Sequence, residues 1–270
     1  MRAASLSHQS ETLQRARRNW PEYLIEGWAL GTFMIAAGVC ATLLEWPESP
    51  LHRAISDPTL RRVIGGVAMG LTAAALIYSP WGQRSGAHMN PAVTLTFLRL
   101  GKIHRDDALG FVLAQFIGGT VGVLIVAALL GSAFTSPPVR YAATVPGPNG
   151  VALAFAAELI ISAVLMLVVL IVSNTPRLAR YTGIAAGTLV ATYIAVEAPL
   201  SGMSINPARS FASAAPGVIW QDFWIYCTAP VLGMLAGAQL FLLVRGAKGA
   251  ACAKLMHPAD QRCIHCGHEP

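Results

Sequence analysis

The sequence predicts an all-α membrane protein in which six transmembrane helices and two re-entrant half-helices form an inverted repeat of two three-helix halves. Three observations predict this fold. The chain is unusually apolar, its hydrophobic residues gather in six long segments, and the tripeptide Asn-Pro-Ala occurs twice, at residues 90–92 and 206–208. Each element is justified in turn below.

The composition excludes an ordinary soluble domain. Of the 270 residues, 54% are hydrophobic and only 12% are charged, and the mean hydropathy is +0.55. A soluble domain carries about 25% charged residues. The formal net charge of +6 comes from basic residues that lie between apolar segments rather than along one patch. We interpret these basic residues as determinants of how the chain is oriented in a membrane. The expected partner is therefore the lipid bilayer and not nucleic acid.

Six segments reach or approach the roughly 20 residues that cross a hydrocarbon layer of ~30 Å. The fifth segment is the shortest, and it ends at Glu197 and Pro199. The apolar residues are continuous rather than alternating, which favours helices over a strand-built barrel. The expected spans are residues 23–45, 63–82, 108–131, 150–173, 182–199 and 222–244.

The distribution of basic residues predicts that both termini are cytoplasmic. With this orientation, the only Lys or Arg residues on the opposite side are Arg53, Arg61, Arg62, Arg140 and Arg209. The first 20 residues are polar and are expected to form a lead-in, with a short interfacial helix, rather than a cleaved signal peptide. We expect a multi-pass protein of the plasma or inner membrane.

Three domains follow from these assignments. Residues 1–21 form a cytoplasmic N-terminal segment, residues 22–245 form the membrane domain, and residues 246–270 form a cytoplasmic tail that contains Cys and His. The membrane domain divides into halves at about 22–134 and 150–245. The segment between them is rich in Pro and Gly and is interpreted as a linker.

The two halves repeat the same order of features. Each has a glutamate early in its first helix (Glu26, Glu158), then an Asn-Pro-Ala segment, and then a third helix with a glutamine (Gln115, Gln239). Three spans is an odd number, so the second half must enter the membrane from the opposite side. Such inverted repeats are typical of transport proteins.

The Asn-Pro-Ala motifs have the chemistry of helix starts. Asn is a preferred N-cap, Pro suits the first helical position, and Ala lets two helix ends approach closely. The segments after Asn90-Pro91-Ala92 and Asn206-Pro207-Ala208 are too short to cross the membrane. Non-helical backbone at that depth must be buried in protein or line a cavity. We therefore expect two half-helices whose N-termini meet near the centre.

Such a meeting point predicts a passage for uncharged molecules. Facing helix N-termini carry partial positive charge that opposes cations, and the Asn amides can donate hydrogen bonds to a passing oxygen. A single motif would be an ordinary helix cap, but two symmetric copies favour a pore. Isolated glutamates in hydrocarbon are costly. Glu26 and Glu158 are expected to accept hydrogen bonds from the backbone before the half-helices, and His88 is grouped with this support.

At this point the sequence resembles the aquaporin, or major intrinsic protein, family. The resemblance rests on "SGAHMNPAVT", "SINPARS", both glutamates and the order of six spans, and it covers about residues 22–245. It implies an aquaporin-like bundle, a homotetramer with one pore per subunit, and passive flow without a cofactor. No enzymatic activity is expected, because the spans offer no nucleophile–base pair or metal cluster. It also implies that Asn90 and Asn206 form the central constriction.

The resemblance further implies a selectivity filter that contains Arg209. Counting from local anchors places Met69, Ile194 and Met203 at the other filter positions. Water-selective members usually have Phe and His at the first two positions, whereas glycerol-conducting members have Trp and Gly, then Phe. This chain matches neither pattern. The alternatives are a core salt bridge between Arg209 and Glu197, and ordinary helix packing for Met69 and Ile194.

These residues predict a passive channel for water and other small uncharged solutes, such as glycerol, urea, hydrogen peroxide or neutral metalloid acids, that excludes protons and ions. Ser210, Ala214 and Tyr226 instead resemble the water-selective members, and Cys227 matches neither group. A strictly water-selective channel is therefore the main alternative. Two remoter alternatives are a coupled transporter and a non-conducting structural protein. The transporter is disfavoured because the spans offer few ionisable groups for coupling.

The tail after the last span carries three of the five cysteines, Cys252, Cys263 and Cys266. The Cys-x2-Cys pair lies near several histidines, and Cys263, Cys266 and His268 are a candidate for part of a tetrahedral zinc site. The favoured interpretation is a solvated tail without metal. Disulfides are not expected in a reducing cytoplasm.

Overall fold

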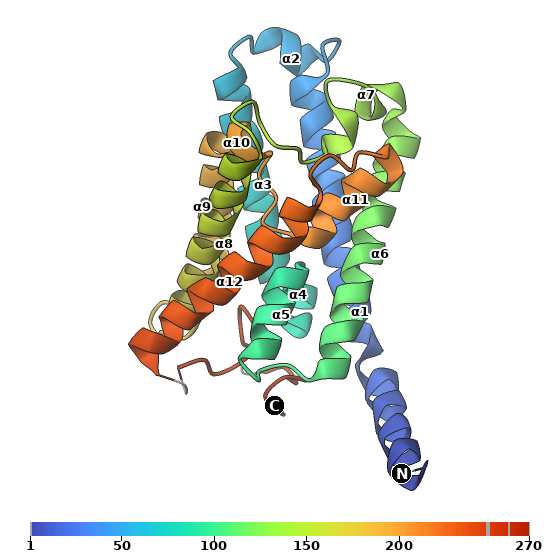
Figure 1. Ribbon diagram of the computed structural model, residues 1–270, viewed down its shortest axis with the longest axis vertical. Helices are drawn as coiled ribbons and strands as arrows, with labels where there is room; N and C mark the ends of the chain where they lie inside the picture. Colours follow the sequence, from blue (N-terminus) through green and yellow to red (C-terminus); the bar gives the residue numbers. More distant parts are fainter. Residues whose placement is uncertain (1, 247–248, 259, 270) are drawn as a thin grey trace.

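The protein is a bundle of long helices that surrounds shorter ones (Figure 1). The computed structural model describes residues 2–246, 249–258 and 260–269, and side chains from residue 14 onward. All regular secondary structure within these ranges is helical. The predicted all-α membrane fold, with its six spans and two half-helices, is confirmed.

Within the part of the chain that the structure describes, five helices have the length and apolar composition of a membrane span. The remaining predicted span corresponds to α9, which has only 15 residues and is extended by short helical turns on either side. This is the segment that the sequence predicts to be shortest. The spans are α1 (Arg2–Glu45, its apolar part Gln14–Glu45), α3 (Pro58–Tyr78), α6 (Arg105–Leu130), α8 (Val151–Ser173), α9 (Thr182–Val196) and α12 (Trp224–Arg245).

The N-terminal segment does not form a separate interfacial helix. Helix α1 continues without interruption from Arg2 through Pro21 into the first span, and its first turns extend beyond the bundle (Figure 1). Shorter helices connect the spans. They are α2 (Pro50–Ala54), α4 (Pro80–Ser85), α7 (Ser132–Thr135), η1 (Arg140–Ala142), η2 (Ala179–Tyr181) and α10 (Ala198–Ser201).

The two half-helices are α5 (Pro91–Arg99) and α11 (Pro207–Gly217). Each begins with proline at its first position and has an extended asparagine as N-cap, as the sequence predicts. Helix α5 packs against α12 of the second half, and α11 packs against α6 of the first half. Each half-helix is therefore held between the two halves of the repeat.

Small residues bring the spans together in pairs. Helix α1 packs along α6, α3 along α9, and α8 along α12. At Gly118 of α6, an added Cβ would lie 2.0 Å from the carbonyl oxygen of Gly27, and at Gly70 of α3 it would lie 2.4 Å from that of Gly187. Backbones at this separation leave no room for a side chain, as is common between membrane helices.

We expect Gly118→Val to destabilise the bundle by roughly 3 kcal/mol, because α1 and α6 must separate to admit the side chain. The measurement is thermal unfolding of the purified protein in detergent. Ala128→Val is the matched control, since Ala128 is exposed on the same helix. Equal melting temperatures for the two variants would show that the close α1–α6 contact does not limit stability.

The two glutamines of the repeat do not occupy matching positions. Gln115 is fully buried, whereas Gln239 is exposed. In each half, one glycine of the third helix packs against the backbone of the residue that follows the glutamate, and it serves as a reference point. The matching position lies three residues before this glycine. This count places Pro230 opposite Gln115. The predicted correspondence of Gln115 and Gln239 is therefore wrong, because the two glutamines share only a residue type.

Large apolar side chains cover the outside of the bundle. Leu71, Ile117, Leu129 and Leu243 are each at least 65% exposed, and all lie on predicted spans. A soluble protein rarely exposes apolar surface so extensively, but lipid tails provide a matching solvent. The chain is an integral, multi-pass membrane protein.

Candidate functional site

The two Asn-Pro-Ala motifs meet inside the bundle through a reciprocal pair of hydrogen bonds. The Nδ2 of Asn90 donates to the carbonyl oxygen of Ile205 at 2.7 Å, and the Nδ2 of Asn206 donates to that of Met89, also at 2.7 Å. Each Oδ1 caps its own helix by accepting from the backbone N–H of Ala92 or Ala208. Each amide group thus keeps a second N–H that is free to face a passing molecule.

Glu26 holds the backbone that leads into α5. Its carboxylate accepts hydrogen bonds from the backbone N–H of His88 at 3.0 Å and of Met89 at 2.6 Å. It also accepts from the Ser85 hydroxyl at 2.7 Å and from the Gln115 amide at 2.9 Å. Four donors converge on one fully buried carboxylate, which fixes the orientation of the non-helical segment.

Glu158 plays the same part in the second half. It accepts from the backbone N–H of Ser204 at 2.6 Å and of Ile205 at 2.7 Å, and from the Ser201 hydroxyl at 2.7 Å. The Tyr226 hydroxyl donates to the Ser201 carbonyl at 2.6 Å and so supports the same turn. The sequence does not predict this contact, because Tyr226 and Ser201 are distant in the chain.

The backbone before each half-helix has an unusual conformation that also follows the repeat. Ala87 and Met89 in the first half, and Met203 and Ile205 in the second, all have φ between 49° and 55°. Residues with a side chain rarely adopt this left-handed region. The conformation allows the carbonyl groups of Met89 and Ile205 to face the opposite asparagine, and the buried glutamates stabilise it. A functional site is where such strain is expected.

A cavity of about 260 Å³ runs past the meeting point of the half-helices. Its wall is mostly apolar. Both asparagines of the Asn-Pro-Ala motifs line it, whereas Pro91, Ala92, Pro207 and Ala208 are not among its lining residues. The predicted filter residues and His88 also line it: they are Met69, Ile194, Met203 and Arg209. The structure therefore brings together residues from α3, α9 and the loop before α11, which lie far apart in the sequence.

Arg209 is held by a carbonyl group rather than by a carboxylate. Its Nη1 donates to the carbonyl oxygen of Ala142 at 2.9 Å. Among the ion pairs of the described residues, none joins Arg209 to Glu197, so the salt-bridge alternative is not realised. The guanidinium faces the cavity. Ala142 was not predicted, because nothing in its sequence context marks the linker as part of the filter.

A buried hydroxyl cluster holds the linker against α11. The Ser210 hydroxyl lies 2.7 Å from that of Thr144 and 2.6 Å from that of Ser204. Ser210 follows Arg209, so the cluster fixes the first turn of α11 beside the linker that contains Ala142. Ser210 is 1% exposed, and its contacts are structural ones within the loop.

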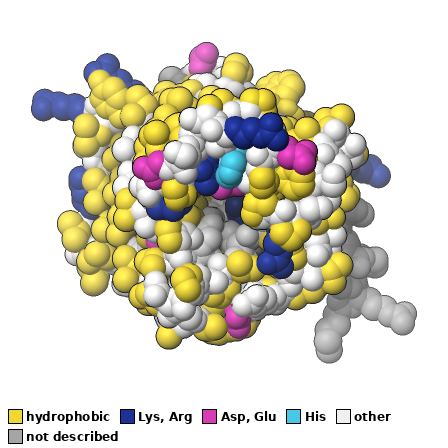
Figure 2. Space-filling view, turned by 90° about the horizontal axis from the view of Figure 1, so that it is seen from above, with side chains coloured by type: hydrophobic (Ala, Val, Ile, Leu, Met, Phe, Trp, Pro, Cys, Tyr) yellow, Lys and Arg dark blue, Asp and Glu magenta, His cyan; other side chains and the backbone are white. Residues whose placement is uncertain are grey.

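One mouth of the cavity carries basic side chains. Arg61 and Arg62 line it together with Glu45, and Figure 2 shows dark-blue Lys and Arg side chains around the hollow on this face. The Nη2 of Arg61 lies 3.3 Å from the Glu45 carboxylate, and Arg61 also donates to the carbonyl groups of Ile55 and Ser56. Arg61, an exception to the positive-inside pattern, is therefore neutralised locally.

The C-terminal tail lies at the other mouth, below α4 and α5 in Figure 1. The side chain of Leu255 lines the cavity. His88 Nε2–H donates to the carbonyl oxygen of Ala253 at 2.8 Å, and His265 Nε2–H donates to that of Ser85 at 2.9 Å. Burial lowers the pKa of His265 to about 4, so its ring is neutral near pH 7. The expectation of a solvated tail is wrong for these residues.

The tail cysteines also differ from the expected grouping. Cys263 and Cys266 lie close to Cys252 and His257, which places four potential metal ligands together. The ring of His268, the third predicted ligand, lies 5.5 Å from the ring of His257, and its carbonyl oxygen accepts from the backbone N–H of Cys263. The Cys-x2-Cys pattern indicates two of the potential ligands, but the identity of the others depends on how the tail folds.

An inverted repeat with two facing half-helices and a continuous cavity defines a membrane channel for water and small solutes. The family model for "Major intrinsic protein" matches residues 15–241. The chain belongs to this family, whose members are channels and not enzymes.

Known relatives agree with this assignment. The chain is 31% identical to nodulin-26 of Glycine max over 219 residues, which cover 80% of this chain and 76% of that protein. It is also 31% identical to aquaporin NIP1-2 of Arabidopsis thaliana, with 80% and 72% covered. The X-ray structure of the aquaglyceroporin from Plasmodium falciparum superimposes with a TM-score of 0.68 at 22% identity, covering 82% of this chain and 94% of that one.

Proposed function

We propose that this channel conducts water in single file together with small uncharged solutes such as glycerol, urea, hydrogen peroxide or neutral metalloid acids, and excludes protons and ions. The observation that carries the proposal is one cavity lined by both asparagine caps and by Met69, Ile194, Met203 and Arg209. Water reorients at Asn90 and Asn206, where each amide offers a free N–H to its oxygen.

Fixed positive charge provides the exclusion of cations. The N-termini of α5 and α11 face one point, and each carries about +0.5 of an elementary charge. The guanidinium of Arg209 adds a full charge on the same wall. A cation that enters must lose hydration in a positive field, whereas an uncharged molecule experiences only hydrogen-bond donors.

The filter residues favour passage of solutes larger than water. Met69, Ile194 and Met203 contribute no hydrogen-bond donor from their side chains, and methionine adapts its shape to irregular surfaces. Arg209, which lines the same cavity, can donate to a hydroxyl or carbonyl oxygen. A solute with one apolar and one polar face matches this arrangement. The alternative, a strictly water-selective channel, would require that these side chains close the passage to anything wider.

The wider organisation of the channel is also part of the proposal. Residues 22–245 form the channel domain, and residues 1–21 and 246–270 lie in the cytoplasm, as the basic residues near the ends of the spans favour. Four copies form a homotetramer in the plasma or inner membrane, with one pore in each subunit. Chemical cross-linking of the detergent-solubilised protein tests the number of subunits.

Osmotic swelling of proteoliposomes tests the proposed conduction. We expect water permeability well above that of empty vesicles, without dissipation of an imposed proton gradient. Swelling at the rate of empty vesicles would favour a non-conducting structural protein. Solute uptake that stops when an ion gradient is collapsed would favour a coupled transporter.

The double variant Met69→Phe/Ile194→His tests the filter. These residues introduce an aromatic ring and a donor that narrow the passage, so glycerol, urea and arsenite permeability should fall about tenfold or more, equivalent to about 1.4 kcal/mol of barrier, while water still passes. Stopped-flow light scattering of one preparation measures all four permeants. Unchanged glycerol and urea permeability would contradict the filter assignment.

A further inference from the structure

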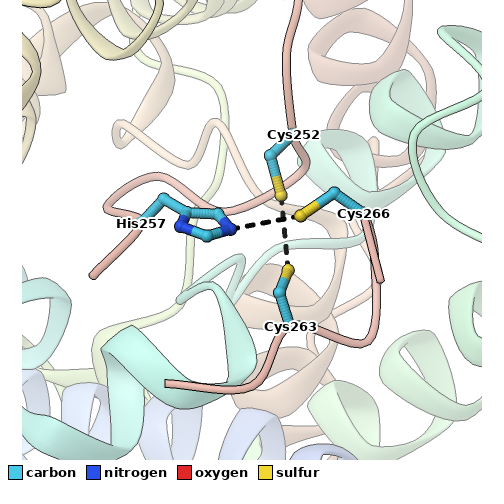
Figure 3. Close-up of side chains that lie close together, drawn as sticks. All are labelled: Cys252, His257, Cys263 and Cys266. Atoms are coloured by element: carbon cyan, nitrogen blue, oxygen red, sulfur yellow. Dashed lines mark hydrogen bonds between the residues drawn. The ribbon is translucent and has the colours of Figure 1, made fainter. Parts of the chain in front are cut away.

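Four side chains of the C-terminal tail converge on one point (Figure 3). The sulfur atoms of Cys252, Cys263 and Cys266 and a ring nitrogen of His257 all lie within 4.8 Å of one another. The two sulfurs of Cys252 and Cys263 are 3.4 Å apart, and the His257 Nε2 lies 3.2 Å from the Cys266 sulfur. Ligand atoms of a tetrahedral zinc site are separated by about 3.5–3.8 Å. The cluster therefore has the size that one ion requires.

Cys252, Cys263 and Cys266 are free cysteines, so all three sulfur atoms remain available as ligands. A disulfide would use two of the four ligand atoms and would leave His257 without a role.

The charge balance of the tail also favours a metal–thiolate centre. Lys254 is only 3% exposed, and its ammonium donates to the carbonyl oxygen of Arg262. No ion pair among the described residues includes Lys254. A buried cation is costly without a counter-charge. Three thiolates and one Zn²⁺ ion carry a net charge of −1. This charge would be the counter-charge for Lys254, which lies two residues after Cys252.

The four ligand positions bracket the tail residues that contact the pore. Ala253 and Leu255 lie between Cys252 and His257, and His265 lies between Cys263 and Cys266. The backbone N–H of Leu255 donates to the carbonyl oxygen of Gly86 at 3.1 Å, in the segment that leads into α5. An ion at the cluster would thus tie together the two stretches of tail that cover this mouth of the cavity.

We propose that Cys252, His257, Cys263 and Cys266 bind one Zn²⁺ ion, which holds the tail across the mouth beside His88 and reduces conduction. Tetrahedral coordination by three thiolates and one imidazole suits zinc. The effect on conduction rests on the proposed channel function, whereas metal binding does not. Loss of the ion would release Leu255 from the cavity.

Metal content of the purified, reduced full-length protein tests the site. We expect one zinc per chain after incubation with ZnCl₂ and dialysis, and a tetrahedral cobalt–thiolate absorption spectrum when CoCl₂ is used. Cys263→Ser/Cys266→Ser should weaken zinc binding about a hundredfold or more. Cys227→Ser is the matched control, because Cys227 lies in α12 outside the cluster. Absence of zinc from the reduced wild-type protein would overturn the proposal.

Water permeability of zinc-loaded and chelated proteoliposomes tests the effect on the pore. Chelation with a membrane-permeant chelator should raise the water permeability of the wild type several-fold. The water permeability of Cys263→Ser/Cys266→Ser should be high with or without zinc. Leu255→Ala should bind zinc normally yet conduct faster when loaded, which separates the covering residue from the ligands. Elution volume and circular dichroism check that each variant is folded.

The two readouts separate the possible failures. Stoichiometric zinc with permeability that is measurable but unaffected by chelation would overturn the proposed closure. Stoichiometric zinc with no permeability in any variant, even after chelation, would contradict the proposed function and leave the metal site standing. Zinc bound equally by wild type and Cys263→Ser/Cys266→Ser would show that the ion binds elsewhere and would overturn the site.

Discussion

Replacing Glu158 with leucine is expected to abolish the folded channel. Three donors in the loop before α11, the backbone N–H groups of Ser204 and Ile205 and the Ser201 hydroxyl, would lose their acceptor. Each unsatisfied buried group costs about 1–3 kcal/mol. Their sum is comparable to the ~5–15 kcal/mol that stabilises a typical folded protein. The left-handed backbone at Ile205 would also lose its support.

The measurement is the fraction of detergent-solubilised protein that elutes at the wild-type volume, followed by water permeability of that fraction. Glu158→Gln keeps one acceptor oxygen, so we expect an intermediate yield. Glu48→Leu is the matched control, because Glu48 is exposed and the same side-chain change removes no buried acceptor. Wild-type yield and permeability for Glu158→Leu would refute the role of this carboxylate in holding the loop.

Replacing Arg209 with valine is expected to admit small cations. The guanidinium places a full positive charge on the wall of the cavity that Met203 and Ile194 also line. At 4 Å, a unit charge changes the energy of a passing cation by about 1–4 kcal/mol, depending on the effective dielectric constant. Ammonium and proton flux should therefore rise by at least about fivefold. Water permeability should remain, because the asparagine pair is unchanged.

Proteoliposomes loaded with a pH-sensitive dye measure both fluxes. Arg140→Val is the matched control, since Arg140 is exposed in the linker and lies outside the cavity lining. Flux that stays at the wild-type level in Arg209→Val would assign cation exclusion to the half-helix N-termini alone. Increased flux in both variants would show that general loosening of the linker, and not the charge at the filter, is responsible.

Local sequence was sufficient for the starts of the half-helices. Asn90 and Asn206 cap α5 and α11 because the side chain, the following proline and the helix N–H groups act within three residues. The spans were predictable for a similar reason, since a helix in lipid must satisfy its own backbone and be apolar along its length. The weak fifth span became the short helix α9.

Register between distant segments was less predictable. Gln115 and Gln239 share a residue type and similar places in their helices, yet only Gln115 reaches a buried glutamate. Glu197 looked like the natural partner of Arg209, but the guanidinium binds the carbonyl oxygen of Ala142 instead. Backbone carbonyl groups carry no sequence signature, so such a partner is visible only after the chain has folded.

The sequence by itself determined the membrane class, the inverted repeat and the paired helix caps, because hydropathy, span number and capping are properties of short stretches of chain. Only the tertiary structure decided which side chains share the cavity, how the carbonyl groups before the half-helices face the opposite asparagine, and that the tail covers one mouth with Cys252 and His257 beside Cys263 and Cys266. These contacts join residues far apart in the chain, and their geometry is set by the packing of the whole bundle.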